Sequence, residues 1–255
     1  MHLILAFQGF QVTGTLTQLG IPDLLGEPST AAKVAETIQA NPDACFRLMR
    51  AAAAVGVLQV DPATTGAEDP ITGILFSLTP AGEPLKTGTP GSLRSCISMF
   101  SMPGHYLPHG LLPKAIKTGK CTTHEALGGD IWSYYKKESK EGLLFSEAMK
   151  EFTNLASSAI VNSSYDWTGV HTVVDVGGSQ GALLVHVLKK LPEVKGILFD
   201  LPETVAAAPP YLASCGVAER VECVGGDFFQ AVPRGDCHML KFIIHDWSPF
   251  PRSRL

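Results

Sequence analysis

The sequence predicts an α/β protein in two parts, a mainly helical winged-helix domain followed by a doubly wound parallel sheet. The first part is predicted because helix signals and two short strand-like runs come before residue 80 in the order helix, turn, helix, hairpin. The second is predicted because β-branched runs alternate with apolar helical stretches from residue 172 onward, as in right-handed crossovers of a parallel sheet. We place the domains at residues 1–90, 91–165 and 166–255.

Local signals set the elements of the first part. Ser29 is a candidate N-cap for a helix over residues 30–39. Asn41 and Pro42 combine a cap with a proline at the first helical position, and Gly56 can end the helix that they start. The expected strands are residues 57–60 and 75–78, and the later expected helices are residues 92–102, 111–118, 131–137 and 142–161.

The second part reads as strands and helices in alternation. A strand over residues 172–176 precedes a glycine-rich loop, and a helix with leucines and valines on one face follows it. The other expected elements are strands at residues 195–199, 220–224 and 237–243 and a helix at residues 203–215.

The charge balance argues against binding to nucleic acid. The net charge is −4 and the isoelectric point about 6.0, whereas proteins that neutralise phosphates carry a basic excess. Residues 29–78 hold three basic and five acidic side chains, so we interpret the winged helix as a dimerisation module. Charged residues make up 17% of the chain, below the ~25% usual in soluble domains, which favours a surface buried against another subunit.

Hydropathy and cysteine usage predict a cytoplasmic protein. No apolar run approaches the ~18 residues of a membrane span, so we expect no membrane association. The six cysteines include no Cys-x-x-Cys pair. In a chain of this length they predict buried, reduced thiols rather than a disulfide framework or a metal site.

Residues 175–181, Asp-Val-Gly-Gly-Ser-Gln-Gly, lie where the first strand of the sheet meets its helix, the point at which such sheets bind nucleotides. The dinucleotide fingerprint fails because two of its glycine positions fall on Ser179 and Ala182, and the loop lacks a P-loop lysine. Asp175 leads the loop, which suits a cationic ligand. The glycines that would let this ligand approach the backbone are Gly177, Gly178 and Gly181.

Two more acidic residues follow the next two strands. A carboxylate at Asp200 can accept from both hydroxyls of a ribose, and Asp227 can accept from an adenine amine while Phe228 stacks on the ring. Acids at three successive strand ends, without a phosphate cradle, fit S-adenosylmethionine with its ribose, adenine, ammonium and sulfonium groups. The alternative, that each aspartate only caps the helix after it, is strong for one residue and weak for three.

The chain resembles the S-adenosylmethionine-dependent small-molecule O-methyltransferases of plant, fungal and bacterial secondary metabolism. The matching segments are residues 19–25, 47–56, 78–83, 145–149, 175–181, 199–202, 226–229, 240–241 and 245–247. The resemblance implies a Rossmann-like class I methyltransferase domain with an incomplete sheet, preceded by a helical segment at the substrate pocket. It also implies a homodimer in which each subunit helps to close the other's pocket. Relatives often have a third consecutive glycine where this chain has Ser179.

The resemblance also implies roles for individual residues. The residue matching His245 removes the proton from the acceptor hydroxyl, and those matching Phe145 and Met149 line the acceptor pocket. Among the aromatic segments between the domains, Trp132 and His105 are further pocket candidates, and no metal is expected. The cofactor residues expected from motifs and resemblance together are Asp175, Gly177, Gly178, Gly181, Asp200, Leu201, Asp227, Phe228, Lys241 and Trp247.

These residues predict methyl transfer to a hydroxyl, in the first place a phenolic one, of a small aromatic metabolite. Such a transfer is an in-line displacement, so the enzyme chiefly positions its two reactants. Proton transfer from a phenol (pKa ~10) to a histidine (pKa ~6.5) is roughly 5 kcal/mol uphill, so the proton should leave in concert with the attack. A histidine in an apolar strand is more often a core residue, but His245 follows a strand end, where the site is expected.

After Trp247 the chain reads Ser-Pro-Phe-Pro-Arg-Ser-Arg-Leu, whereas relatives continue through further strands. We therefore expect a truncated chain with most cofactor contacts, weak or absent turnover, and an exposed apolar strand edge over residues 239–244. Two alternatives stay open. One is a relative that uses the same cofactor for decarboxylation or hydroxylation; the other is a non-catalytic protein, either a winged-helix regulator or a dimerising partner of a complete enzyme.

Overall fold

The computed structural model describes residues 2–247 and contains two compact units, residues 1–151 and 152–255. The functional division at residues 90 and 165 stays a prediction. The helices of the first unit are α1 (His2–Gln18), α2 (Ile21–Leu24), α3 (Ala31–Thr37), α4 (Pro42–Ala54), α5 (Pro70–Gly73), α6 (Arg94–Ser101), α7 (Pro103–Gly110), α8 (Leu112–Thr118), α9 (Thr123–Leu127) and α10 (Ile131–Lys137), and α11 (Ser139–Val161) continues into the second unit.

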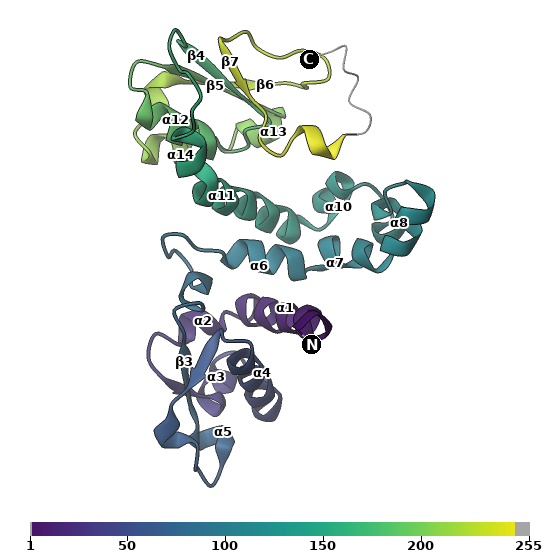
Figure 1. Ribbon diagram of the computed structural model, residues 1–255, viewed down its shortest axis with the longest axis vertical. Coiled ribbons are helices and arrows are strands. Elements are labelled where there is room, and N and C mark those ends of the chain that lie inside the picture. Colours follow the sequence, from purple (N-terminus) through teal and green to yellow (C-terminus); the bar gives the residue numbers. More distant parts are fainter. Residues whose placement is uncertain (1, 248–255) are drawn as a thin grey trace. The chain divides into compact units, whose positions relative to one another are not determined.

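A winged helix is built from α3, α4 and a three-stranded antiparallel sheet in the order β1-β3-β2 (Figure 1). The strands are β1 (Ser29–Thr30), β2 (Leu58–Val60) and β3 (Leu75–Leu78). The expected cap at Asn41 is confirmed, because its side chain accepts a hydrogen bond from the backbone N–H of Ala44 at 2.9 Å. Gly56, with φ +83°, follows α4 as expected. The largest fully buried core side chains of this domain are Leu16, Ile21, Met49, Leu58 and Phe76.

The predicted cap at Ser29 is wrong by one residue. Thr30 caps α3, its hydroxyl accepting from the backbone N–H of Lys33 at 3.3 Å. Ser29 is instead paired with Phe76 in the sheet, because the chain runs as a short strand immediately before the helix begins. The two-residue strand β1 had no periodicity from which it could be predicted.

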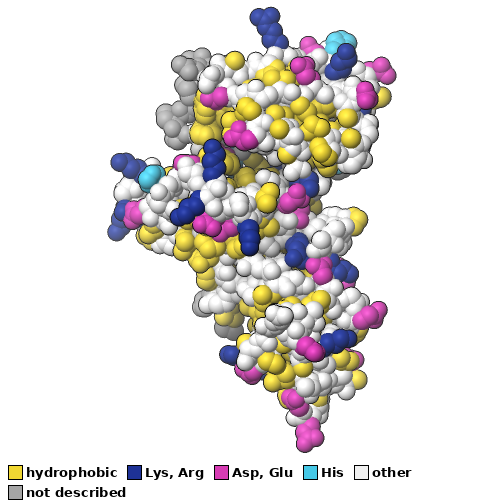
Figure 2. Space-filling model, turned by 180° about the vertical axis from the view of Figure 1, so that it is seen from behind, with side chains coloured by type: hydrophobic (Ala, Val, Ile, Leu, Met, Phe, Trp, Pro, Cys, Tyr) yellow, Lys and Arg dark blue, Asp and Glu magenta, His cyan; other side chains and the backbone are white. Residues whose placement is uncertain are grey.

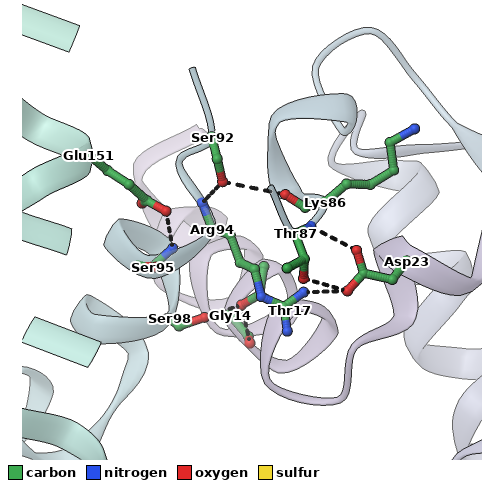
Figure 3. Close-up of polar contacts among 10 residues, drawn as sticks. All are labelled: Gly14, Thr17, Asp23, Lys86, Thr87, Ser92, Arg94, Ser95, Ser98 and Glu151. Atoms are coloured by element: carbon green, nitrogen blue, oxygen red, sulfur yellow. Dashed lines mark hydrogen bonds and ion pairs between the residues drawn. The ribbon is translucent and has the colours of Figure 1, made fainter. Parts of the chain in front are cut away.

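Polar contacts join α6 to the elements before and after it in the sequence (Figure 3). The carboxylate of Asp23 accepts from the backbone N–H of Thr87 at 2.7 Å and from the guanidinium of Arg94 at 2.9 Å. The carboxylate of Glu151, on α11, accepts from the backbone N–H groups of Ser95 at 3.1 Å and Cys96 at 2.9 Å. These first N–H groups of a helix have no partner within the helix. The Ser92 hydroxyl accepts from the N–H of Arg94 at 3.2 Å, and Glu151 caps the next two N–H groups of α6.

Helix α7 was not predicted, since a Met-Pro-Gly sequence followed by a second proline reads as a break. Pro103 occupies the first turn of the helix, where its missing N–H costs nothing. The N–H of Gly104 donates to the carboxylate of Glu141 at 3.1 Å. The helix is therefore supported by a residue 37 positions away, which local sequence signals do not reveal.

The second unit contains a parallel four-stranded sheet in the order β6-β5-β4-β7, with α12 packed against β4 and β5 (Figure 1). Its strands are β4 (Thr172–Val176), β5 (Lys195–Asp200), β6 (Val221–Gly225) and β7 (Cys237–Met239), and its helices are α12 (Ala182–Lys190), α13 (Pro202–Val205) and α14 (Pro209–Ser214). The apolar face of α12 is buried as predicted, with Leu184, Val187 and Leu188 fully covered. The α/β fold class is confirmed.

Two elements of the second unit differ from expectation. The helix predicted over residues 203–215 is two helices, because Pro209 and Pro210 start a new one. The strand predicted over residues 237–243 ends at Met239, because the chain turns at once and Phe242 adopts φ +58°. The apolar strand edge expected over residues 239–244 is therefore wrong. Residues 248–255, the tail after Trp247, lie outside the described residues.

Charge is mixed on the first unit. On the face shown in Figure 2, basic and acidic side chains are interspersed over this unit. Within residues 2–247, no helix combines the length and the apolar character needed to cross a membrane. All six cysteines are free thiols.

Candidate active site

The loop after β4 depends on glycine at defined positions. Gly177 and Gly181 have φ of +69° and +86°, a region in which side chains are strained. The N–H of Gly177 donates to the carbonyl oxygen of Phe199 at 2.8 Å, which ties the loop to β5. A Cβ atom at Gly177 would lie 2.4 Å from Cδ1 of Ile243. The loop thus exposes backbone where no side chain fits.

Asp175 lies beneath this loop. Its side chain is 2% exposed, and a Cβ atom at Gly178 would lie 2.8 Å from its Oδ2. Oδ2 is buried and accepts no hydrogen bond within the described part of the chain. Burial raises the pKa of Asp175 to about 7, against the opposing effects of the Leu184 N–H and the charge of Lys241. An orphaned acceptor beside bare glycine backbone suits a cationic ligand at this loop.

Asp200 ends β5 and holds the glycine loop. Its Oδ2 accepts from the backbone N–H of Ser179 at 2.8 Å, and its Oδ1 accepts from the N–H of Leu201 at 2.7 Å. Burial raises the pKa of Asp200, while these two N–H groups act in the opposite direction. A carboxylate has about four acceptor positions. The Thr204 hydroxyl also acts on this carboxylate, and its remaining acceptor capacity suits the hydroxyls of a ribose.

Asp227 and Phe228 follow β6. Oδ1 of Asp227 accepts from the backbone N–H of Phe229 at 2.9 Å. Its carboxylate therefore caps the turn that follows, as the alternative of a purely capping aspartate predicts. The ring of Phe228 packs on the buried side chains of Val174, Val176 and Phe199, and its centroid lies 5.9 Å from that of Trp247. A partly exposed ring beside a carboxylate is an arrangement that can stack on a nucleobase.

The turn after β7 carries the remaining candidates of the second unit. Lys241 Nζ lies 4.1 Å from the ring centroid of Phe242. His245, in the short 3-10 helix η4 (Ile244–Asp246), has its Nε2 3.3 Å from Oδ1 of Asp246. The His245 side chain is 66% exposed, so it is not a core histidine. Its proximity to Asp246 gives it a carboxylate partner within the turn.

The pocket candidates of the first unit gather in one aromatic cluster, comprising Phe100, His105, Trp132, Tyr135 and Phe145. The ring centroids of His105 and Trp132 lie 6.4 and 5.6 Å from that of Phe145. Tyr135, which the sequence analysis missed, lies 5.0 Å from Phe145 and has its hydroxyl 3.3 Å from His105 Nδ1. Met149 lies one helical turn after Phe145 on α11.

The structure thus brings the sequence-predicted residues together in two groups. The cofactor candidates and His245 belong to the second unit, and the acceptor-pocket candidates belong to the first. Tyr135 was missed because its neighbour Tyr134 offers the same local signal, and only burial distinguishes the two. Among residues 2–247, no set of three or more His, Cys, Asp or Glu side chains is arranged to hold a metal ion.

Two family models match the chain, one to each part. The model of the O-methyltransferase dimerisation domain matches residues 1–87, and the model of the O-methyltransferase domain matches residues 109–251.

Several known methyltransferases match almost the whole of this chain. O-demethylpuromycin-O-methyltransferase of Streptomyces alboniger is 36% identical over 97% of the chain and 64% of its own length. Phenazine O-methyltransferase of Lysobacter antibioticus is 32% identical over 96% of the chain and 70% of its own length. The chain therefore spans about two thirds of the length of these relatives. The crystal structure of human N-acetylserotonin methyltransferase in complex with SAM has a TM-score of 0.85 at 25% identity, covering 97% of this chain and 70% of that one.

Proposed function

This chain belongs to the O-methyltransferase family, and from that premise we propose that it transfers a methyl group from S-adenosylmethionine to a hydroxyl of a small aromatic metabolite. The observation that carries the proposal is the loop after β4, where Asp200 fixes Ser179 and a buried oxygen of Asp175 has no partner among the described residues. The acceptor hydroxyl is in the first place phenolic. Aromatic side chains around His105 support a flat acceptor.

The residues of the second unit fit the cofactor group by group. The remaining acceptor capacity of Asp200 suits the ribose hydroxyls, and Phe228 suits one face of the adenine. The bare backbone at Gly177 and Gly178 suits close approach of the amino-acid moiety. We assign Asp175 to the charge balance of that moiety through the loop. We also assign Leu201, Asp227, Lys241, Gly181 and Trp247 to the cofactor site.

We propose His245 as the base. Bound S-adenosylmethionine supplies an electrophilic methyl group, so the protein has to orient the acceptor oxygen and accept its proton. His245 Nε2 lies on an exposed turn directly after β7, at the carboxyl end of the parallel sheet, where ligands of such sheets bind. Asp246 lies 3.3 Å from this nitrogen, so it can stabilise an imidazolium formed during the transfer.

We propose a cytoplasmic homodimer. The match of residues 1–87 to a dimerisation domain supports self-association, and exposed apolar side chains such as Leu5 and Phe7 on α1 support a covered surface there. Six free thiols support a reducing compartment. Mixed charge on the winged helix gives no support to a DNA-binding regulator.

Calorimetric titration with S-adenosylhomocysteine, the demethylated product, tests the cofactor site first. We expect micromolar binding that Asp200→Ala abolishes. A methyl-transfer assay with hydroxylated aromatic compounds then separates binding from catalysis: His245→Asn should retain product binding and lose transfer. Binding without transfer by the unchanged chain would favour a non-catalytic relative. A folded chain that does not bind the product would contradict the proposal. The same methyl-transfer assay tests whether the turnover of this chain is weak, as expected.

A further inference from the structure

The aromatic cluster of the first unit contains one buried polar pair. The hydroxyl of Tyr135, a residue that is 8% exposed, lies 3.3 Å from Nδ1 of His105. The imidazole is flanked by Phe145, with ring planes 21° apart, and by the edge of Phe100, at a centroid distance of 5.2 Å. A polar pair inside an otherwise apolar cluster incurs a desolvation cost unless each group has a partner. Its presence therefore needs an explanation beyond packing.

The proton positions in this pair follow from its surroundings. Burial raises the pKa of Tyr135, so the phenol keeps its proton. Burial and the nearby His109 lower the pKa of His105, so the imidazole is neutral near pH 7. A phenol is a good donor and a neutral imidazole nitrogen is a good acceptor. The Tyr135 O–H therefore donates to Nδ1, which places the remaining ring proton of His105 on Nε2.

The Nε2–H group of His105 has no hydrogen-bond partner within the described part of the chain, and it is not among the buried unpartnered atoms there. It is thus a donor with a fixed tautomer, open to a ligand. Its position is held by Glu141, whose carboxylate accepts both from the N–H of Gly104, the residue before His105, and from the Tyr134 hydroxyl at 2.8 Å.

The charge around the donor selects among acceptor oxygens. No hydrogen bond or ring contact of His105, Trp132, Tyr135 and Phe145 within the described chain involves a lysine or arginine. After burial, the largest effect on the pKa of Tyr135 comes from the negative charge of Glu141. An anionic oxygen would lose its hydration here without gaining a cation. An uncharged carbonyl oxygen would gain a hydrogen bond at little desolvation cost.

We propose that His105 Nε2–H, oriented by Tyr135, binds a carbonyl oxygen of the methyl acceptor, so that the substrate class is a flat hydroxylated aromatic ketone or quinone rather than an aromatic carboxylate. This inference rests on the proposed function, because it assumes that the cluster binds the acceptor. It makes His105 a specificity-determining residue and Tyr135 a positioning residue that acts through it.

Three derivatives of 2-naphthol with one substituent on the same ring carbon test this proposal. The substituent is acetyl, ethyl or carboxylate, so that only the carbonyl oxygen and the charge vary. Binding to the full chain, saturated with S-adenosylhomocysteine, is measured by calorimetry. We expect the acetyl compound to bind roughly tenfold more tightly than the ethyl compound, as for one net hydrogen bond. The carboxylate should bind more weakly than the acetyl compound.

The variants separate the donor from the packing. His105→Phe keeps an aromatic ring and should bring the acetyl-to-ethyl affinity ratio close to one, with binding of the ethyl compound retained. Tyr135→Phe should lower the ratio in part, because both tautomers of His105 then coexist. Tyr106→Phe, the same change directly after His105 in the sequence, should leave the ratio unchanged, because the Tyr106 side chain is exposed.

Each outcome bears on one of the two proposals. A wild-type ratio of one, an unchanged ratio in His105→Phe, tighter binding of the carboxylate, or no binding of any compound would overturn the inference. Methyl transfer is assayed separately with the acetyl compound. If the acetyl-to-ethyl affinity ratio is as expected but no methyl transfer occurs, the proposed function alone is contradicted. If transfer occurs but His105→Phe leaves the affinity ratio unchanged, the inference alone is contradicted.

Discussion

Oδ2 of Asp200 lies 2.8 Å from the backbone nitrogen of Ser179 and accepts its hydrogen bond, so the end of β5 fixes the loop that follows β4. Ser179 has φ +53°, an unfavourable region for a serine. The hydrogen bond stabilises this conformation in a loop whose other positive-φ residues, Gly177 and Gly181, are glycines. The same carboxylate proposed to bind the ribose therefore also shapes the loop.

Asp200→Asn is expected to loosen this loop. The amide of asparagine can replace one accepting oxygen but turns an N–H group toward the other backbone N–H. Deuterium exchange of residues 177–181 should accelerate, and S-adenosylhomocysteine should bind about tenfold more weakly. Asp236→Asn is the matched control, since Asp236 accepts from two backbone N–H groups at the opposite end of β4. Equal loss of affinity in both variants would contradict a specific role for Asp200.

Asp175 should make folding stability fall as pH rises. Burial raises its pKa from 3.8 to about 7 in the folded chain, so between pH 4 and 7 the folded state binds a proton that the unfolded state has released. Stability contributed by this group is present below the unfolded pKa and is lost up to the folded pKa, at roughly 1 kcal/mol per pH unit. Relative to Asp175→Asn, the unchanged chain should lose stability from pH 5 to 7 in urea unfolding and show no further loss above pH 8.

Asp236→Asn again serves as the control for this pH series. Hydrogen bonds from the His171 and Thr172 N–H groups lower the pKa of Asp236, so its contribution is constant above pH 5. A stability difference for Asp175→Asn that does not vary between pH 5 and 7 would contradict a raised pKa for the buried carboxyl of Asp175.

Gly178→Ala should destabilise the second unit. The new Cβ atom would lie 2.5 Å from Cδ1 of Leu198 and 2.7 Å from Cγ of Asp175, and neither neighbour can move without disturbing the core. We expect a loss of about 1–3 kcal/mol in urea unfolding, together with weaker product binding. Gly26→Ala, with no atom within 4 Å of its Cβ position, should be close to neutral. Unchanged stability of Gly178→Ala would show that the loop lies further from Asp175 than described.

Glu151→Ala should destabilise α6. Two backbone N–H groups at the start of the helix lose their acceptor, which costs about 1–2 kcal/mol in thermal unfolding. Glu147→Ala provides the control on the same helix. Among the described residues, the carboxylate of Glu147 forms an ion pair with Lys150 near the surface, and such pairs contribute little. If both variants lost equal stability, the effect would come from helix α11 itself and not from the capping of α6.

The sequence allowed prediction of elements whose signals are local. Residues 131–137 and 172–176 match α10 and β4 at both ends, because apolar periodicity and flanking residues agree there. Helix α7 could not be predicted because its support, Glu141, comes from a distant segment. In the site, the order of acids and glycines along the chain pointed to Asp200 and the loop, but the burial of Tyr135 beside His105 arises only from tertiary packing.

The strand order β6-β5-β4-β7 also has a consequence for the sequence of folding events. β4 pairs with β5 across a short crossover. The other edge of β4 pairs with β7, which lies some 60 residues further along the chain. Nearby pairings close first because their loop entropy is smaller. During synthesis, the edge of β4 that later pairs with Cys237–Met239 is therefore unpaired and apolar. Until β7 has been synthesised, this edge is the part of the sheet most prone to aggregation and most in need of a chaperone.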